Sequence, residues 1–362
     1  TTQPEENKNL NFDNDDTLRK FNKEIESIIK TNEKKDYAES IHKFVIDYSV
    51  PDFIAKALNL IDEFENRNTQ GVFLNINLTE PKKGQLNTNP FDKNLIIETL
   101  KERIVNLVKN SCHTTSAPLP SINNSTNSYY PNQGPTSLCG PATFFYCLLI
   151  DRPDLYVKCV IDLWEKGEVK IKNLTIKPSE DCKKPKSLEN DRYKINGIDW
   201  ITLASLRDSK NIIFRYNEAS DQAAGITLAG ALKEWFLKVG AKLLFSNVTY
   251  GLHIGKDELL CLVKYKQQYS QAHIVSLVNA GLFSNKKTFL KFKSHWIVWK
   301  TAPQSNGKDI DLNIKNAAIT QEVVTWGEID RKLDQPTLAD YLSYNFGAMV
   351  FLPIPYELGE CE

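Results

Sequence analysis

The sequence lacks an excess of charge of either sign, because 45 basic and 45 acidic residues give it a formal net charge of zero. Proteins that bind the phosphate backbone of nucleic acids carry a cationic excess, so we expect no nucleic-acid partner. The sequence also lacks an uninterrupted apolar run of about 18 residues, the length that a membrane-spanning helix requires. We therefore expect no membrane partner.

The cysteines and histidines lack the spacing of a metal site. Seven cysteines and five histidines are present, but the sequence has no CxxC pair and no Cys/His cluster with the spacing of metal ligands. An odd number of widely separated cysteines is typical of free thiols in a reducing compartment. The sequence thus predicts a cytoplasmic protein that requires neither a metal nor an organic cofactor.

The N-terminal residues lack the basic start and the apolar stretch of a signal peptide. If the protein acts in another cell, we expect its export to use no Sec signal. Residues 1–16 also hold almost no apolar side chains, which predicts that they are disordered.

Apolar residues at helical spacing predict a mainly helical N-terminal region over residues 17–112. Residues 113–130 are rich in Ser, Thr, Asn and Pro, which is the composition of a linker. We therefore place a domain boundary there, with a second domain over residues 131–362. The segments of the N-terminal region with helical spacing are 15–30, 36–48, 52–67 and 89–111.

The second domain changes from helical to strand periodicity along its length. Helices first and an antiparallel sheet last predict an α+β domain. Helices are predicted over residues 141–150, 154–167, 197–208 and 225–240, and strands over 272–279, 288–300, 310–320 and 347–354.

Cys139 lies between turn-forming residues and an apolar helical segment. Gly134, Pro135, Gly140 and Pro141 turn the backbone on both sides of it, so that a helix can begin at the sulfur. The unpaired amides of a helix start, together with a nearby imidazolium, favour the thiolate, which is the nucleophilic form of cysteine. The pattern predicts a catalytic thiol.

Gln133 precedes this cysteine by six residues. A loop of that length can fold back and direct the side-chain amide at an oxyanion that forms beside the sulfur. We therefore predict Gln133 as an oxyanion donor. Cys147 falls on the apolar face of the following helix, and we predict that it packs in the core.

The general base must be one of the five histidines, since imidazole titrates near neutral pH. His42 lies in the helical region, His113 in the linker and His253 in a predicted loop. His273 and His295 each start an apolar strand. We favour His295, because its strand is followed by a hairpin signal and a returning strand that carries polar side chains to orient the ring. His273 is the competing base.

The residue that orients the imidazole is predicted on the returning strand. The register of this hairpin depends on its turn, and a tight turn at Asn306-Gly307 would bring residues near 316 opposite His295. The candidates are Asp311, which is our first choice, and Asp309, Asn313 and Asn316, which stay open.

The order and spacing of these residues resemble the papain-like cysteine peptidase superfamily. Gln133, the SLCG segment around Cys139 and the HWIV strand that begins at His295 carry the resemblance, which covers roughly residues 126–355. It implies a papain-like domain with Cys139 as nucleophile, His295 as base, Asp311 as orienting residue and Gln133 as oxyanion donor.

More narrowly, the segments GPTSLCGPATFFYCLL, GIDWITLASLRDS and HWIVWK resemble papain-like toxin domains that bacteria deliver into competitors. This resemblance implies a cysteine protease that acts on a protein of the target cell through a thioacyl intermediate, with a cognate immunity protein as partner. The same triad would also serve a peptidoglycan amidase, a deamidase or a transglutaminase. From other classes, a non-catalytic binding module on a papain-like shell and a helical scaffold that uses the N-terminal region stay open.

Overall fold

The computed structural model describes residues 52–74, 89–111, 129–134, 136–188, 195–209, 227–249, 252–283 and 294–354. The predicted disorder of residues 1–16, the helices predicted over 15–30 and 36–48, and nearly all of the predicted linker lie outside these residues.

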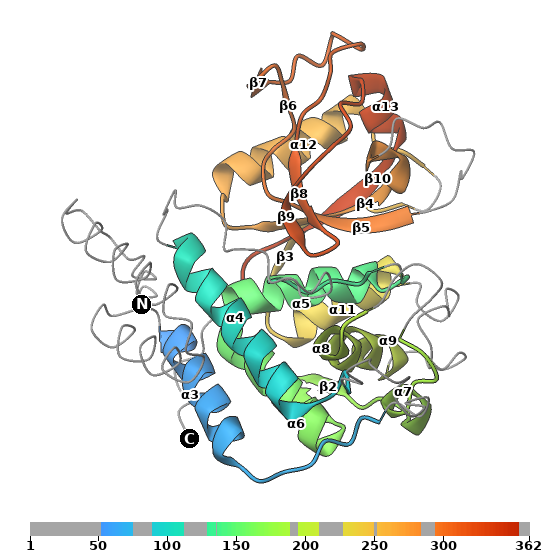
Figure 1. Ribbon diagram of the computed structural model, residues 1–362. Helices are drawn as coiled ribbons and strands as arrows, with labels where there is room; N and C mark the ends of the chain where they lie inside the picture. Colours follow the sequence, from blue (N-terminus) through green and yellow to red (C-terminus); the bar gives the residue numbers. More distant parts are fainter. Residues whose placement is uncertain are drawn as a thin grey trace, which may run out of the picture.

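A helical layer is built from the part of the described chain that precedes residue 240, and Figure 1 shows α3, α4 and α6 side by side in it. Its longer helices follow the predicted apolar spacing. They are α3 (Asp52–Asn66), α4 (Lys93–Ser111), α5 (Cys139–Asp151), α6 (Pro153–Lys166) and α11 (Ala229–Lys238). Shorter elements complete the layer: α7 (Glu180–Lys183), α8 (Gly197–Asp199), the π-helix η1 (Trp200–Ala204), α9 (Ser205–Ser209), and the hairpin of β1 (Val169–Ile171) and β2 (Leu174–Ile176).

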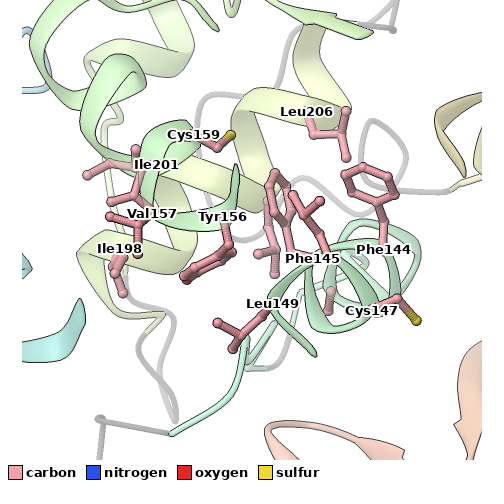
Figure 2. Close-up of a cluster of buried hydrophobic side chains, with 14 of the residues drawn as sticks. Phe144, Phe145, Cys147, Leu149, Tyr156, Val157, Cys159, Ile198, Ile201 and Leu206 are labelled. Carbon is pink, nitrogen blue, oxygen red and sulfur yellow. The ribbon is translucent and has the colours of Figure 1, made fainter. Parts of the chain in front are cut away.

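The local sequence explains the ends of α6. Pro153 at its first position lacks the N–H that would be unpaired there, and Asp154 places a negative charge in the first turn. Gly167 ends the helix with a φ of 72°, a left-handed conformation that glycine adopts without strain. Figure 2 shows side chains of α5, α6 and the α8–η1 segment, among them Phe145 and Tyr156, meeting in one buried apolar cluster.

The second layer is a six-stranded antiparallel sheet in the order β3-β10-β4-β5-β8-β9. In Figure 1, α12 and α13 lie on the side of the sheet away from α5. The α+β class is therefore confirmed. The elements of this layer are β3 (Leu243–Ser246), α12 (Lys256–Gln268), β4 (His273–Asn279), the 3-10 turn η2 (Ala280–Phe283), β5 (Ser294–Trp299), β8 (Glu322–Thr325), β9 (Glu328–Lys332), α13 (Leu338–Ser343) and β10 (Asn345–Phe351).

Alternation along β5 divides the hydrophobic interior into two cores, since successive side chains of a strand point to opposite faces. Trp296 and Val298 belong to a helix-side core shared with α5 and α6, whereas Ile297 and Trp299 belong to an α12-side core. Buried apolar side chains of α3 and α4, such as Ile61 and Leu100, also belong to the helix-side core. The boundary predicted at residues 113–130 therefore does not separate two hydrophobic cores.

The hairpin predicted after β5 is confirmed at its turn but not in its returning strand. Asn306 and Gly307, with φ of 51° and 71°, form a tight turn between β6 (Gln304–Ser305) and β7 (Lys308–Asp309). The strand predicted over 310–320 is wrong: Asp311 accepts the N–H of Asn313 there and starts a turn, so most of these residues make only turns and isolated bridges. The strand that pairs with β5 is β8.

Among the described residues, no helix has both the length and the apolar character needed to cross a membrane.

Candidate active site

Cys139 is the first residue of α5, as the turn-forming residues around it predict. The residue is only 9% exposed. Burial raises the pKa of its thiol, and hydrogen bonds from the backbone N–H groups of Trp296, Gly140 and Cys139 itself lower the pKa without reversing that direction. The resting structure therefore favours the protonated thiol and not the predicted thiolate, because desolvation outweighs the amides.

Thr227 fixes the start of α5 against the start of β5. A Cβ atom added to Gly140 would lie 2.5 Å from the Cβ of Thr227, so only a glycine beside Cys139 allows this approach. The carbonyl oxygen of Thr227 in turn accepts a hydrogen bond of 3.0 Å from the indole N–H of Trp296. Thr227 thus contacts both the start of α5 and the start of β5.

His295 is buried near the beginning of β5, where its imidazole contacts two aromatic rings. The indole of Trp326 stacks on its imidazole with ring centroids 4.4 Å apart and 13° between the planes, and Phe283 meets it edge-on. Its Nε2 shares a hydrogen bond with the hydroxyl of Thr325 on β8. Burial lowers the pKa of His295 from 6.5 to about 4, so the ring is neutral at physiological pH.

The orienting residue of His295 is therefore Thr325 in this structure, and the prediction of Asp311 is wrong. Asp311 is exposed and accepts the N–H of Asn313 in a turn that follows β7. Asp309, Asn313 and Asn316 are also exposed, and the first of them belongs to the separate β6–β7 hairpin. All four were predicted on the strand beside β5, a position that β8 occupies instead.

Gln133 is 5% exposed and lies in a compact turn that leads into α5. Its side-chain amide donates a hydrogen bond of 2.9 Å to the main-chain carbonyl oxygen of Thr136, and the main-chain carbonyl oxygen of Gln133 accepts one of 2.7 Å from the hydroxyl of Thr136. An amide nitrogen carries two hydrogens, so one such bond leaves a second donor on Gln133. The turn fixes the amide against the carbonyl oxygen of Thr136, three residues before Cys139.

The backbone of β5 meets the thiol of Cys139 at the N–H of Trp296, but the imidazole of His295 lies on the other face of this strand. Phe283, which meets the ring edge-on, packs against the α12-side core, whereas Trp296 and Cys139 belong to the helix-side core. Burial is the only cause of the pKa shift of His295, and no imidazole contributes to that of Cys139. The resting structure therefore holds a neutral thiol and a neutral imidazole, without the imidazolium that the sequence pattern predicts.

A second cluster joins a thiol, an imidazole and a carboxylate at the other end of α5. Nε2 of His273 lies 2.7 Å from Oδ2 of Asp151, and the thiol of Cys147 hydrogen-bonds the same ring. Burial opposes protonation of His273, but Asp151 and Cys147 raise its pKa well above 6.5. The imidazole of His273 is therefore paired with the thiol of Cys147 and not with that of Cys139. Cys147 is fully buried as predicted, and Figure 2 shows its sulfur turned away from Tyr156.

Sequence reasoning missed Thr325, Trp326 and the Asp151 carboxylate. Trp326 and Gly327, with φ of 49° and 78°, form the tight turn between β8 and β9, and an aromatic residue followed by glycine after an apolar run was the available signal. The signal for the second cluster was the spacing of Cys147 and Asp151, which places them on one helix face.

Other candidates lie apart from this site or outside the described residues. His253 is exposed, whereas His42 and His113 lie outside the described residues. The five described cysteines, from Cys139 to Cys261, are free thiols. Within the described segments, no group of three or more His, Cys, Asp or Glu side chains has the arrangement of a metal site. Comparisons of the chain with protein-family models, curated proteins and solved structures found no match.

Proposed function

We propose that this protein is a papain-like cysteine hydrolase that cleaves amide bonds, with Cys139 as nucleophile and His295 as general base. The observation that carries the proposal is the meeting of a helix start and a strand start at one thiol. The sulfur of Cys139 accepts the N–H of Trp296, and His295 is the residue before it. His295 is the base in this proposal because its strand meets the thiol, and the reaction requires its imidazole to turn from the α12-side face toward the sulfur.

The neutral resting pair defines the order of proton transfers. His295 takes the proton of the thiol as the sulfur attacks the carbonyl carbon, because an imidazole with a pKa of about 4 is unprotonated at neutral pH. The side-chain amide of Gln133 and the backbone N–H of Cys139 hold the oxyanion. The imidazolium then protonates the leaving amine, and water hydrolyses the thioacyl intermediate with His295 again as base. Thr325 and Trp326 hold the ring on the α12-side face in the resting structure, so its release from them precedes these steps.

The substrate class rests on the resemblance to papain-like toxin domains. That resemblance favours a protease delivered into another bacterium, with a protein substrate in the cytoplasm of the target cell and an immunity protein as partner. An amidase of peptidoglycan, a deamidase and a transglutaminase use the same nucleophile and base, since a fold does not determine the substrate.

The cluster of Cys147, His273 and Asp151 supports a second candidate centre, because the imidazole of His273 contacts both the thiol and the carboxylate. Its thiol lies in the middle of α5, is fully buried and lacks the free amides of a helix start. The position of Cys139 therefore favours the first centre. A non-catalytic binding module is the alternative from another class, and the raised pKa of Cys139 is the observation that favours it.

Expression of matched cysteine variants in a susceptible bacterium tests these alternatives. We expect the wild type and Cys147→Ala to arrest growth and to create new protein termini, and Cys139→Ala to do neither. Loss of both effects in Cys147→Ala alone would assign catalysis to the second cluster. Growth arrest by Cys139→Ala would favour the binding module. Release of peptidoglycan fragments without new protein termini would identify a wall amidase.

A further inference from the structure

A buried ion pair joins the N-terminal helix α4 to the segment that carries Gln133. Arg103 on α4 and Asp199 at the end of α8 are both fully buried, and two hydrogen bonds connect them, from Nη1 to Oδ1 at 2.9 Å and from Nη2 to Oδ2 at 3.0 Å. Arg103 also donates to the hydroxyl of Tyr156. A planar guanidinium bonded twice to one carboxylate fixes distance and orientation together.

The same ion pair holds the backbone immediately before Gln133. Oδ2 of Asp199 accepts the N–H of Asn132 at 3.1 Å, and Nη2 of Arg103 donates to the carbonyl oxygen of Tyr130 at 3.3 Å. Both contacts end within three residues of the predicted oxyanion donor. Asp199 is itself fixed, because the side chain of Asn196 caps α8 by accepting its N–H at 2.9 Å.

We propose that Arg103 and Asp199 are positioning residues for the oxyanion-binding amide of Gln133. This inference rests on the proposed function, and it makes α4 a working part of the catalytic unit instead of a separate helical region. An oxyanion donor acts only within about 3 Å of the developing charge, and a displacement of about 1 Å can reduce the rate about 100-fold. An ion pair that bonds the backbone one and three residues before Gln133 supplies the required precision.

Two reagents separate positioning of the amide from integrity of the thiol. Iodoacetamide alkylates a cysteine by displacing iodide and forms no oxyanion. A peptide aldehyde instead adds the sulfur of Cys139 to its carbonyl carbon while the proton of the thiol passes to the carbonyl oxygen, so the new C–O group occupies the oxyanion site. The aldehyde therefore reports on Gln133, whereas the alkylation rate reports on access to the sulfur and on its ionisation.

The variants are Asp199→Asn, Gln133→Ala, the two combined, and Tyr156→Phe as a matched control. The change Tyr156→Phe removes a bond to Arg103 and leaves both contacts with the segment before Gln133. We expect Asp199→Asn to weaken aldehyde binding about 10- to 100-fold and to change alkylation by less than about twofold. In the Gln133→Ala background the same change should have an effect below about twofold, and Tyr156→Phe should match the wild type.

Removal of one partner of a buried ion pair can unfold a protein, so Arg103→Met with Asp199→Ala is the second test. This double variant leaves no lone buried charge, and we expect the same selective loss of aldehyde binding. Aldehyde binding that is unchanged in the folded variants would contradict the positioning role of Arg103 and Asp199 but not the proposed function. The same holds if Asp199→Asn weakens aldehyde binding as strongly in the Gln133→Ala background as in the wild type. If the wild-type Cys139 captures no aldehyde, the proposed function itself fails.

Discussion

The burial of His295 as a neutral imidazole predicts a specific loss of stability in acid. Between pH 6.5 and about 4 the unfolded chain binds a proton at this residue, whereas the native protein does not. The free energy of unfolding therefore falls as the pH falls through this window, and the loss is complete below pH 4. We test it with His295→Gln, which keeps a polar partner for Thr325 but does not titrate.

The difference between a pKa of 6.5 and one of about 4 sets the size of the effect at about 3 kcal/mol, since one unit corresponds to about 1.4 kcal/mol. His273 does not contribute in this window, because its pKa is raised well above 6.5 and it is protonated in both states there. The acid effect of His295 is therefore separable from that of the second cluster.

Urea unfolding followed by the fluorescence of the six tryptophans measures this loss at pH 6.5 and at pH 4. We expect the decrease in unfolding free energy to be about 3 kcal/mol smaller in His295→Gln than in the wild type. His253→Gln, at an exposed histidine, is the control and should keep the wild-type decrease. An equal decrease in His295→Gln and the wild type would refute the burial of a neutral imidazole.

Three further predictions follow from the same contacts. The free energy of unfolding of the wild type should decline as the pH rises above 6.5, because the stabilising proton on His273 is lost. His273→Gln should remove this decline, which urea unfolding at pH 6.5 and at pH 9 measures. Asp311→Ala should leave the turnover of a peptide substrate unchanged, because this exposed carboxylate accepts the N–H of Asn313 in a turn away from β5; a steady-state assay beside the wild type checks it. Gly140→Ala should lower the free energy of unfolding by about 1–3 kcal/mol, since its Cβ would lie 2.5 Å from that of Thr227; a shift of the urea midpoint measures it.

Local patterns in the sequence predicted the elements that carry the nucleophile and the base. Glycine and proline around Cys139 place the start of α5 at the sulfur, and apolar, aromatic residues after His295 form β5. The tight turn at Asn306-Gly307 was also predictable from its dipeptide. The α+β class followed from the change of period along the chain, but the six-stranded sheet contains β3, β8 and β9, which carry too few alternating residues to be predicted.

The partners of the two histidines depend on tertiary contacts that no local pattern encodes. His295 meets Thr325 because residues 304–320 form a small hairpin and turns beside the sheet, so that β8 and not the nearest segment pairs with β5. His273 meets Cys147 because α5 packs lengthwise on the sheet, which brings the two ends of one helix to different strands. Sequence spacing fixes neither arrangement.

The most direct measurement of the central claim is covalent capture of the nucleophile by a peptidyl vinyl sulfone, followed by peptide mapping with mass spectrometry. The account predicts a single adduct on Cys139 in the wild type and in Cys147→Ala, with capture strongly slowed in His295→Ala. An adduct on Cys147, or capture at Cys139 that does not depend on His295, would contradict it.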